Sequence, residues 1–268
     1  MCVRSVEPLT YAREGRIITI VQRDKPPTRK EATMGKHYYI IIDTETVTGM
    51  RTVFDLGYKV VDRAGNVYAE ASYVVAETVL TEPGIYTMFT DPFTKGKAPH
   101  YIASLLADLG EFTVADFETI RADVNDTVRA YGATVCAYNV NFDLNALDKT
   151  SKALLGREFF DETPDVLDIW AMALGCICTT AKFVKFVAEH GITTEKGNPQ
   201  TGAEAVYRFL TGDPGFEEAH TAHADCGIEQ AILQKCLNTH KKLRRDTVRM
   251  CLHDPDWCKV CEMYRAIA

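Results

Sequence analysis

The sequence predicts an α/β fold in which a mixed β-sheet carries helices on both faces. Three β-prone runs come first, at residues 38–42, 54–61 and 67–75, and a turn sequence at 62–66 joins the last two. This spacing is typical of an antiparallel meander. After the meander, short apolar strands alternate with amphipathic helices, which predicts a layered arrangement with a site at the ends of strands.

The individual elements follow from their residue patterns. Residues 38–42 are a continuous β-prone run, Tyr-Tyr-Ile-Ile-Ile, as expected of a central strand that is covered on both faces. Thr113 and Asp116 have the spacing of a helix start, apolar residues recur at helical intervals through 117–131, and Gly132 suits the helix end. The other predicted elements are a strand at 134–138, a helix at 142–149, an apolar segment at 166–173 and a helix at 181–190.

The two ends of the chain differ from its middle in the pattern of polar and apolar residues. The first 36 residues are polar and are interrupted by Pro26-Pro27, and only residues 16–22 resemble a short strand. Because Met34 precedes the core strand much as a natural start would, we expect residues 1–33 to be dispensable. The predicted organisation is an N-terminal extension at 1–36, a main α/β domain at 37–240, and a C-terminal tail at 241–268 with a possible metal cluster.

Composition narrows the class of protein. The chain has a formal net charge of −7, which counts against a protein that coats long nucleic-acid duplexes. An acidic protein can still act on a short chain end if part of its negative charge binds metal ions. Nine cysteines without an export signal indicate free thiols or metal ligands rather than disulfides. With no apolar stretch approaching ~20 residues, we expect a cytoplasmic protein with no membrane partner.

Two carboxylates follow the first strand directly. Asp43 and Glu45 are two residues apart, so in an extended chain both side chains point to the same face. Carboxylates at the end of a buried strand are costly unless a cation compensates their charge, and a divalent metal ion with oxygen ligands does so. A polar strand end without any metal is the alternative, since an Asp-x-Glu pair is weak evidence when it stands alone.

Three further candidates lie later in the chain. Asp143 sits where a predicted strand runs into a helix, a position at which the helix dipole favours a carboxylate, although it could simply cap the helix. His220 and Asp225 precede and begin another helical pattern, and histidine can accept a proton from water near neutral pH. If that helix begins near Ala222, His223 and Asp225 are about 200° apart around it, so His223 points away from Asp225. His220 lies in the preceding loop and is free to turn toward Asp225. We therefore expect His220, and not His223, to be the general base.

Together these segments resemble the DEDD exonuclease superfamily, in its histidine subgroup of proofreading subunits, oligoribonuclease and RNase T-like enzymes. The resemblance covers about residues 38–237. It is carried by Asp43-Thr44-Glu45-Thr46, by Asn139, Phe142 and Asp143, and by the His-x-Ala-x-x-Asp pattern of His220, Ala222 and Asp225. Tyr138 departs from the histidine of many members, and Asp168 resembles a recurrent family aspartate to which we assign no catalytic role.

The resemblance implies a ribonuclease H-like fold and a two-metal mechanism with Mg²⁺ or Mn²⁺. By analogy, Asp43 would bridge the two ions, Glu45 and Asp225 would hold the ion nearer the attacking water, Asp143 would support the other, and His220 would be the general base. Four carboxylates bring a formal charge of −4, which two divalent ions balance. All five positions carry the residue type that the family uses for catalysis, so the pattern shows no sign of a relative that has lost its catalytic residues and only binds nucleic acid.

The expected activity is hydrolysis of the phosphodiester bond at the 3′ end of nucleic acid, which removes nucleotide monophosphates one at a time. DNA is the expected substrate. A role in DNA replication or repair with a polymerase or replication partner fits this activity. Two alternatives stay open: an RNA-trimming or oligonucleotide nuclease of the same fold, and a non-catalytic polymerase accessory subunit that only grips a 3′ end. No motif reports on the 2′-hydroxyl that separates RNA from DNA.

A second, weaker metal signal lies near the C-terminus. Cys251, His253, Cys258 and Cys261 form a Cys-x-His-x4-Cys-x2-Cys pattern whose last pair has the spacing of a zinc knuckle. The pattern predicts one structural Zn²⁺. Scattered thiols on a short helical tail are the alternative.

Overall fold

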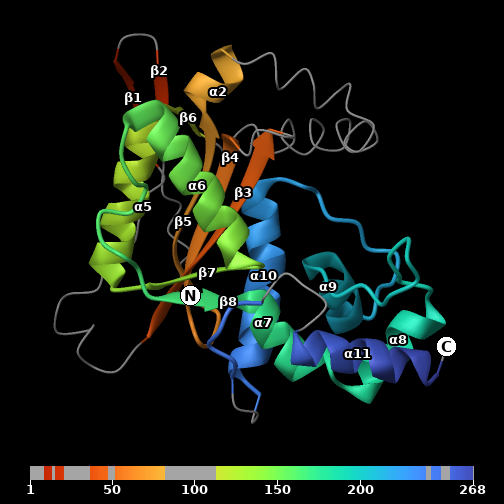
Figure 1. Cartoon of the computed structure of the whole chain (residues 1–268). Coiled ribbons are helices and arrows are strands. Elements are labelled where there is room, and N and C mark those ends of the chain that lie inside the picture. Colours follow the sequence, from red (N-terminus) through yellow and green to blue (C-terminus); the bar gives the residue numbers. More distant parts are fainter. Residues whose placement is uncertain are drawn as a thin grey trace.

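The computed structural model has a central sheet of six strands in the order β6-β5-β4-β3-β7-β8 (Figure 1). β3 (Tyr38–Val47), β4 (Thr52–Asp62) and β5 (Val67–Val75) are antiparallel neighbours. β6 (Thr113–Ala115), β7 (Thr134–Ala137) and β8 (Val166–Asp168) each run parallel to the strand beside them. The structure describes residues 9–13, 16–20, 37–47, 52–81, 113–239, 243–248 and 254–267.

This order is the predicted ribonuclease H-like arrangement, a meander followed by strand-helix units. β3 is the central strand, antiparallel to β4 on one side and parallel to β7 on the other. Asp62 closes the turn between β4 and β5, because its Oδ1 accepts hydrogen bonds from Ala64 N at 2.9 Å and Asn66 N at 3.1 Å. Since β3 and β7 are parallel, their carboxyl ends meet at the same edge of the sheet.

Helices cover both faces of the sheet (Figure 1). α5 (Phe117–Tyr131) and α6 (Val140–Leu155) pack on one face, where Ile40 and Ile42 of β3 join their apolar side chains. α10 (Ala222–Leu237) packs on the other face, where Ile41 lies among the residues of its apolar core. Alternate residues of β3 therefore enter opposite cores, which explains why this strand reads as an uninterrupted apolar run.

Most predicted elements are present, with shifted ends. Asp116 caps α5, its Oδ1 accepting from Thr119 N at 2.7 Å, and Gly132 ends the helix at a φ of 56°. The helix expected at 142–149 is the longer α6. The apolar segment at 166–173 divides into strand β8 and helix α7 (Ile169–Ala173). The helix expected at 181–190 is α8 (Ala181–Glu189).

Several elements were not predicted. They are strand β1 (Leu9–Arg13), which forms a hairpin with β2 (Arg16–Ile20), helix α2 (Ala76–Thr81), strand β6, a π-helical turn η1 (Leu174–Cys178), helix α9 (Ala203–Thr211) and helix α11 (Pro255–Arg265). Thr113, expected at the start of a helix, lies in β6, and Asp116 alone caps α5. α11 contributes Val260 to the same apolar core as α10, and Trp257, Met263 and Tyr264 pack against that core, so part of the C-terminal tail packs on the sheet-bearing body. The boundaries proposed for the three regions stay predictions.

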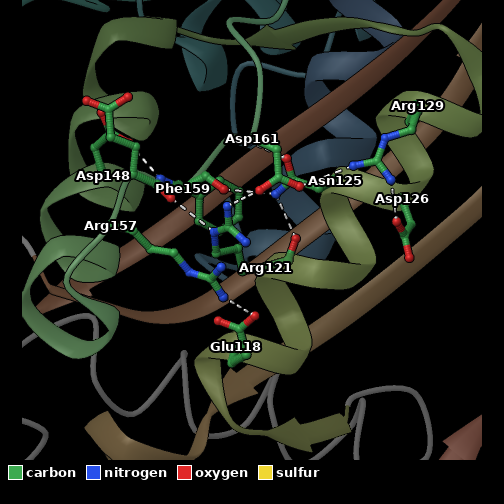
Figure 2. A network of polar contacts seen from close by, with 10 residues as sticks. Glu118, Arg121, Asn125, Asp126, Arg129, Asp148, Arg157, Phe159 and Asp161 are labelled. Carbon is green, nitrogen blue, oxygen red and sulfur yellow. Dashed lines mark hydrogen bonds and ion pairs between the residues drawn. The ribbon is translucent and has the colours of Figure 1, made fainter.

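A polar network fixes the connection between α6 and β8 onto α5 (Figure 2). Arg121 is buried, donates from Nε to Glu158 O at 3.0 Å and pairs with Asp161. Asn125 donates to Phe159 O at 2.8 Å and accepts from Asp161 N at 2.9 Å. These contacts satisfy backbone groups of an irregular segment, and they hold α6 beside α5.

Among the described residues, no single helix is long and apolar enough to cross a bilayer. One bent pair, Ile169–Cys178 with Ala181–Glu189, reaches that length and composition, with a bend of 92° between its halves.

Candidate active site

β3 supplies the first two acidic residues of the site. Asp43 and Glu45 are partly exposed, whereas Ile41 and Ile42 before them are buried. The pairing between β3 and β4 shifts register between Glu45 and Thr46, which marks a β-bulge or irregularity. Bulges bend a strand and redirect its side chains, and they are common beside functional sites.

α6 places Asp143 against the same stretch of β3. The chain turns sharply into this helix at Asn139, whose φ is 67°, and Asp143 follows in the first turn. Its side chain is 3% exposed, and Oδ1 accepts hydrogen bonds from Thr44 N at 3.1 Å and Thr44 Oγ1 at 2.8 Å. Asp143 is therefore tied to the residue between Asp43 and Glu45. Burial raises the pKa of Asp143 to about 7 in spite of these hydrogen bonds.

α10 brings the third segment to the site. The helix begins at Ala222, as expected, and Asp225 lies in its first turn. His220 precedes the helix with a φ of 55°, a left-handed conformation that is uncommon outside glycine. Glu45, His220 and Asp225 each offer one ligand atom, and these atoms all lie within 4.8 Å of one another. Two carboxylates and an imidazole in such a group can hold a divalent cation.

His223 lies apart from this group. Its Nε2 is 3.2 Å from Glu70 Oε2 on β5, and Lys59 Nζ lies 2.6 Å from the same oxygen. The hydrogen bonds from His223 and Lys59 hold the pKa of Glu70 at about 2. The two histidines, three residues apart in sequence, thus have different partners.

Two residues of β4 position the start of α10, and the sequence analysis did not single out either. Asp55 is 1% exposed, and its Oδ2 accepts a hydrogen bond from Ala222 N at 3.1 Å, which satisfies a free N–H of the helix start. Gly57 lies directly beneath the helix, because a Cβ there would be 2.4 Å from His223 N. A glycine inside an apolar strand is the sequence signal for such a close backbone approach.

A fifth acidic residue, Glu229, was also missed. It lies on α10 one turn beyond Asp225, is 2% exposed, and accepts a hydrogen bond at Oε1 from Tyr138 N at 3.0 Å. Burial raises the pKa of Glu229 well above its ordinary value, and the negative charge of the nearby Asp143 raises it further. Nothing in the sequence pattern distinguishes Glu229 from a polar residue on an exposed helix face.

The crowding of these acids fits a site for divalent cations. Burial raises the pKa of Asp43 well above its usual range, and the neighbouring carboxyl groups of Asp143, Glu229, Asp225 and Glu45 raise it further. Crowded buried carboxyl groups destabilise one another when ionised. Bound cations with oxygen ligands would offset this repulsion, so the residues present fit a site for divalent cations.

Asp168 has a structural role. Its Oδ1 accepts from Trp170 N and Asn139 N, and its Oδ2 accepts from Val248 N at 2.9 Å. The residue thereby caps α7 and holds the turn before α6.

The expected zinc cluster is only partly described. Cys251 and His253 lie outside the described residues, while Cys258 is half-buried and Cys261 is buried on α11. Within the described ranges, the group of potential metal ligands found is Glu45, His220 and Asp225. The zinc site stays a prediction.

No protein-family model and no curated protein matches the chain. Similar solved structures include E. coli exonuclease I in complex with a dT13 oligonucleotide, with 16% identity, a TM-score of 0.44, and coverage of 74% of this chain and 40% of that one. Another is a moderately thermophilic exonuclease I from Methylocaldum szegediense, with 18% identity, a TM-score of 0.46, and coverage of 74% and 40%.

The chain thus spans about 40% of the length of these structures. The fold is defined by the strand order and strand directions described above.

Proposed function

We propose that this chain is a metal-dependent 3′→5′ exonuclease of the DEDD superfamily, in its histidine subgroup. The observation that carries the proposal is the convergence of three distant segments. Ligand atoms of Glu45, His220 and Asp225 lie within 4.8 Å of one another, and Asp143 is bound to Thr44 of the same strand. A cluster of carboxyl groups with a purely structural role would leave their mutual repulsion uncompensated, whereas bound cations would offset it.

The four carboxylates Asp43, Glu45, Asp143 and Asp225 would hold two Mg²⁺ or Mn²⁺ ions. When bound, such ions stabilise the attacking and leaving oxygens of an in-line displacement at phosphorus. By the same resemblance, Asp43 would help to hold both ions, Glu45 and Asp225 would hold the one that supplies the attacking water, and Asp143 would help to hold the other.

His220 would accept the proton of the attacking water. Glu218 Oε2 lies 3.9 Å from His220 Nδ1, too far for a hydrogen bond but close enough for its charge to favour a proton on that side of the ring. We therefore assign Nε2 as the nitrogen that takes the proton. The other histidine of this segment, His223, is held by Glu70 and would take no part.

The proposed substrate is a nucleic acid with a free 3′ end, with DNA ahead of RNA, and the product is a nucleotide monophosphate. The net charge of −7 fits a protein that grips a short chain end rather than a long duplex. Action in DNA replication or repair, beside a polymerase or another replication protein, is part of the same proposal.

The test is digestion of single-stranded DNA and RNA of the same sequence, each labelled in turn at the 5′ and at the 3′ end. The proposal predicts that 5′-labelled DNA shortens one nucleotide at a time and that 3′-labelled DNA releases labelled mononucleotide at once. Faster cleavage of RNA would favour the RNA-trimming alternative. Binding of either strand without any cleavage would favour the non-catalytic accessory subunit.

A further inference from the structure

Glu229 is a buried acidic residue that the four-carboxylate scheme leaves without a role. It lies four residues after Asp225 on α10, so the two side chains project from the same face of the helix. The residue is 2% exposed. Full burial of a glutamate is rare unless the carboxyl group has partners.

Each oxygen of Glu229 has a different environment. Oε1 accepts the hydrogen bond from Tyr138 N, at the turn that leads through Asn139 into α6. Oε2 is buried, and it has no hydrogen-bond partner among the described residues. A buried acceptor without a partner is destabilising, and the contact with Tyr138 does not account for Oε2.

The surroundings of Glu229 are acidic. Asp43, on β3, and Asp143, on α6, are both close enough to interact with it electrostatically, as is Asp225 on its own helix. Glu229 therefore lies between the strand and the two helices that carry the proposed metal ligands. It is linked by a hydrogen bond to the segment that precedes Asp143.

We propose that Glu229 is a positioning residue of the metal site, which joins α10 to the β7–α6 turn through Oε1 and strengthens cation binding through the charge of Oε2. This inference rests on the proposed function, because it assumes that cations bind among the four carboxylates. Glu229 touches no ion in this scheme. It acts through the placement of Asp143. Although burial raises the pKa of Glu229, nearby bound cations favour its ionised form, which adds negative potential behind the ligands.

A purely structural role makes a different prediction. If Glu229 served only to accept the hydrogen bond of Tyr138 N, Glu229→Gln would replace it fully, because an amide oxygen accepts the same bond. If the charge of Oε2 matters, Glu229→Gln weakens cation binding although the hydrogen bond is kept. Glu229→Ala removes both the charge and the hydrogen bond.

The experiment is calorimetric titration of the metal-free full chain with Mn²⁺, with the melting temperature measured before and after metal is added. We expect an Mn²⁺ affinity about 10–100-fold weaker in Glu229→Gln, with a smaller metal-induced rise in melting temperature. Glu229→Ala should bind at least as weakly and should melt below Glu229→Gln in EDTA. Glu77→Gln is the matched control, because Glu77 likewise accepts a backbone N–H from a distant segment, that of Phe117, and lies outside the acidic cluster.

The outcomes separate the two proposals. Wild-type affinity in Glu229→Gln, with Mn²⁺ bound normally by the wild-type chain, would overturn the role of Glu229 and leave the proposed function standing. An equal loss in Glu77→Gln would also overturn it, since the effect would not be specific to this site. A wild-type chain that binds no Mn²⁺ would overturn the proposed function itself, and the role of Glu229 with it.

Discussion

Gly57→Ala should displace the helix that carries Asp225, although Gly57 itself bears no functional group. The added Cβ would lie 2.4 Å from His223 N and 2.5 Å from both Ala222 C and His223 Cα, all of them backbone atoms. Ordinary contact begins near 3.4 Å, so the start of α10 must move by about 1 Å. No rotamer change can relieve such a contact, because the clashing atoms belong to the main chain.

The displacement has two measurable consequences. A shift of about 1 Å at a catalytic group costs on the order of 10²-fold in rate, and it would separate Asp225 and His220 from Glu45. Overpacking of this kind typically lowers the free energy of unfolding by about 1–3 kcal/mol. The assays are kcat/KM on a 5′-labelled oligonucleotide at saturating Mg²⁺ and urea unfolding of the same preparation.

Gly227→Ala is the matched control, because Gly227 lies on α10 itself and a Cβ there meets nothing within 4 Å. Alanine should stabilise the helix by up to ~1 kcal/mol and leave activity near the wild-type value. If Gly57→Ala kept wild-type kcat/KM and stability, the close packing of α10 on β4 would be wrong. Equal losses in both variants would refute the explanation by a main-chain clash.

Three further predictions concern single groups. Thr44→Val removes the hydroxyl that donates to Asp143 Oδ1. It should lower the free energy of unfolding by about 1–2 kcal/mol in urea melts, and Thr44→Ser should restore most of the loss. His220→Ala should reduce turnover by about 10²–10⁴-fold, whereas His223→Ala should stay near wild type in parallel rate measurements; equal losses would contradict the assignment of the base. In EDTA, stability should fall as pH rises from about 4 to about 7, because native Asp143 keeps its proton up to a pKa of about 7 whereas the unfolded chain loses it near 3.8. Urea melts across this range should show the fall, and Mg²⁺ should reduce it; a rise in EDTA would contradict the burial of this carboxyl group.

The sequence predicts those parts of the structure that depend on local pattern. The apolar run at 38–42 indicates a strand buried on both faces, and β3 is such a strand. The end of α5 is marked by Gly132, which adopts the left-handed conformation at the cap. The five candidate site residues were found in the same way, because each lies in a short motif at the end of a strand or beside the start of a helix.

The missed residues act through contacts between distant parts of the chain. Asp55 binds Ala222 N, 167 residues away, and Glu229 binds Tyr138 N, 91 residues away. No local pattern encodes such contacts, since they depend on how α10 lies on the sheet. The start of α11 is a different case, because Asp254 and Pro255 form a recognisable N-cap and first turn, a signal that the sequence analysis overlooked.

The most direct test of the central claim compares the wild-type chain with Asp225→Asn on a 5′-labelled single strand, in Mg²⁺ and in EDTA. Asp225→Asn removes one charge from the proposed metal site with little change in side-chain shape. The account predicts stepwise shortening from the 3′ end by the wild type in Mg²⁺ alone, and no cleavage by Asp225→Asn under either condition, with the melting temperature in EDTA not lowered. Cleavage that persists in EDTA, or an Asp225→Asn variant as active as the wild type, would contradict it.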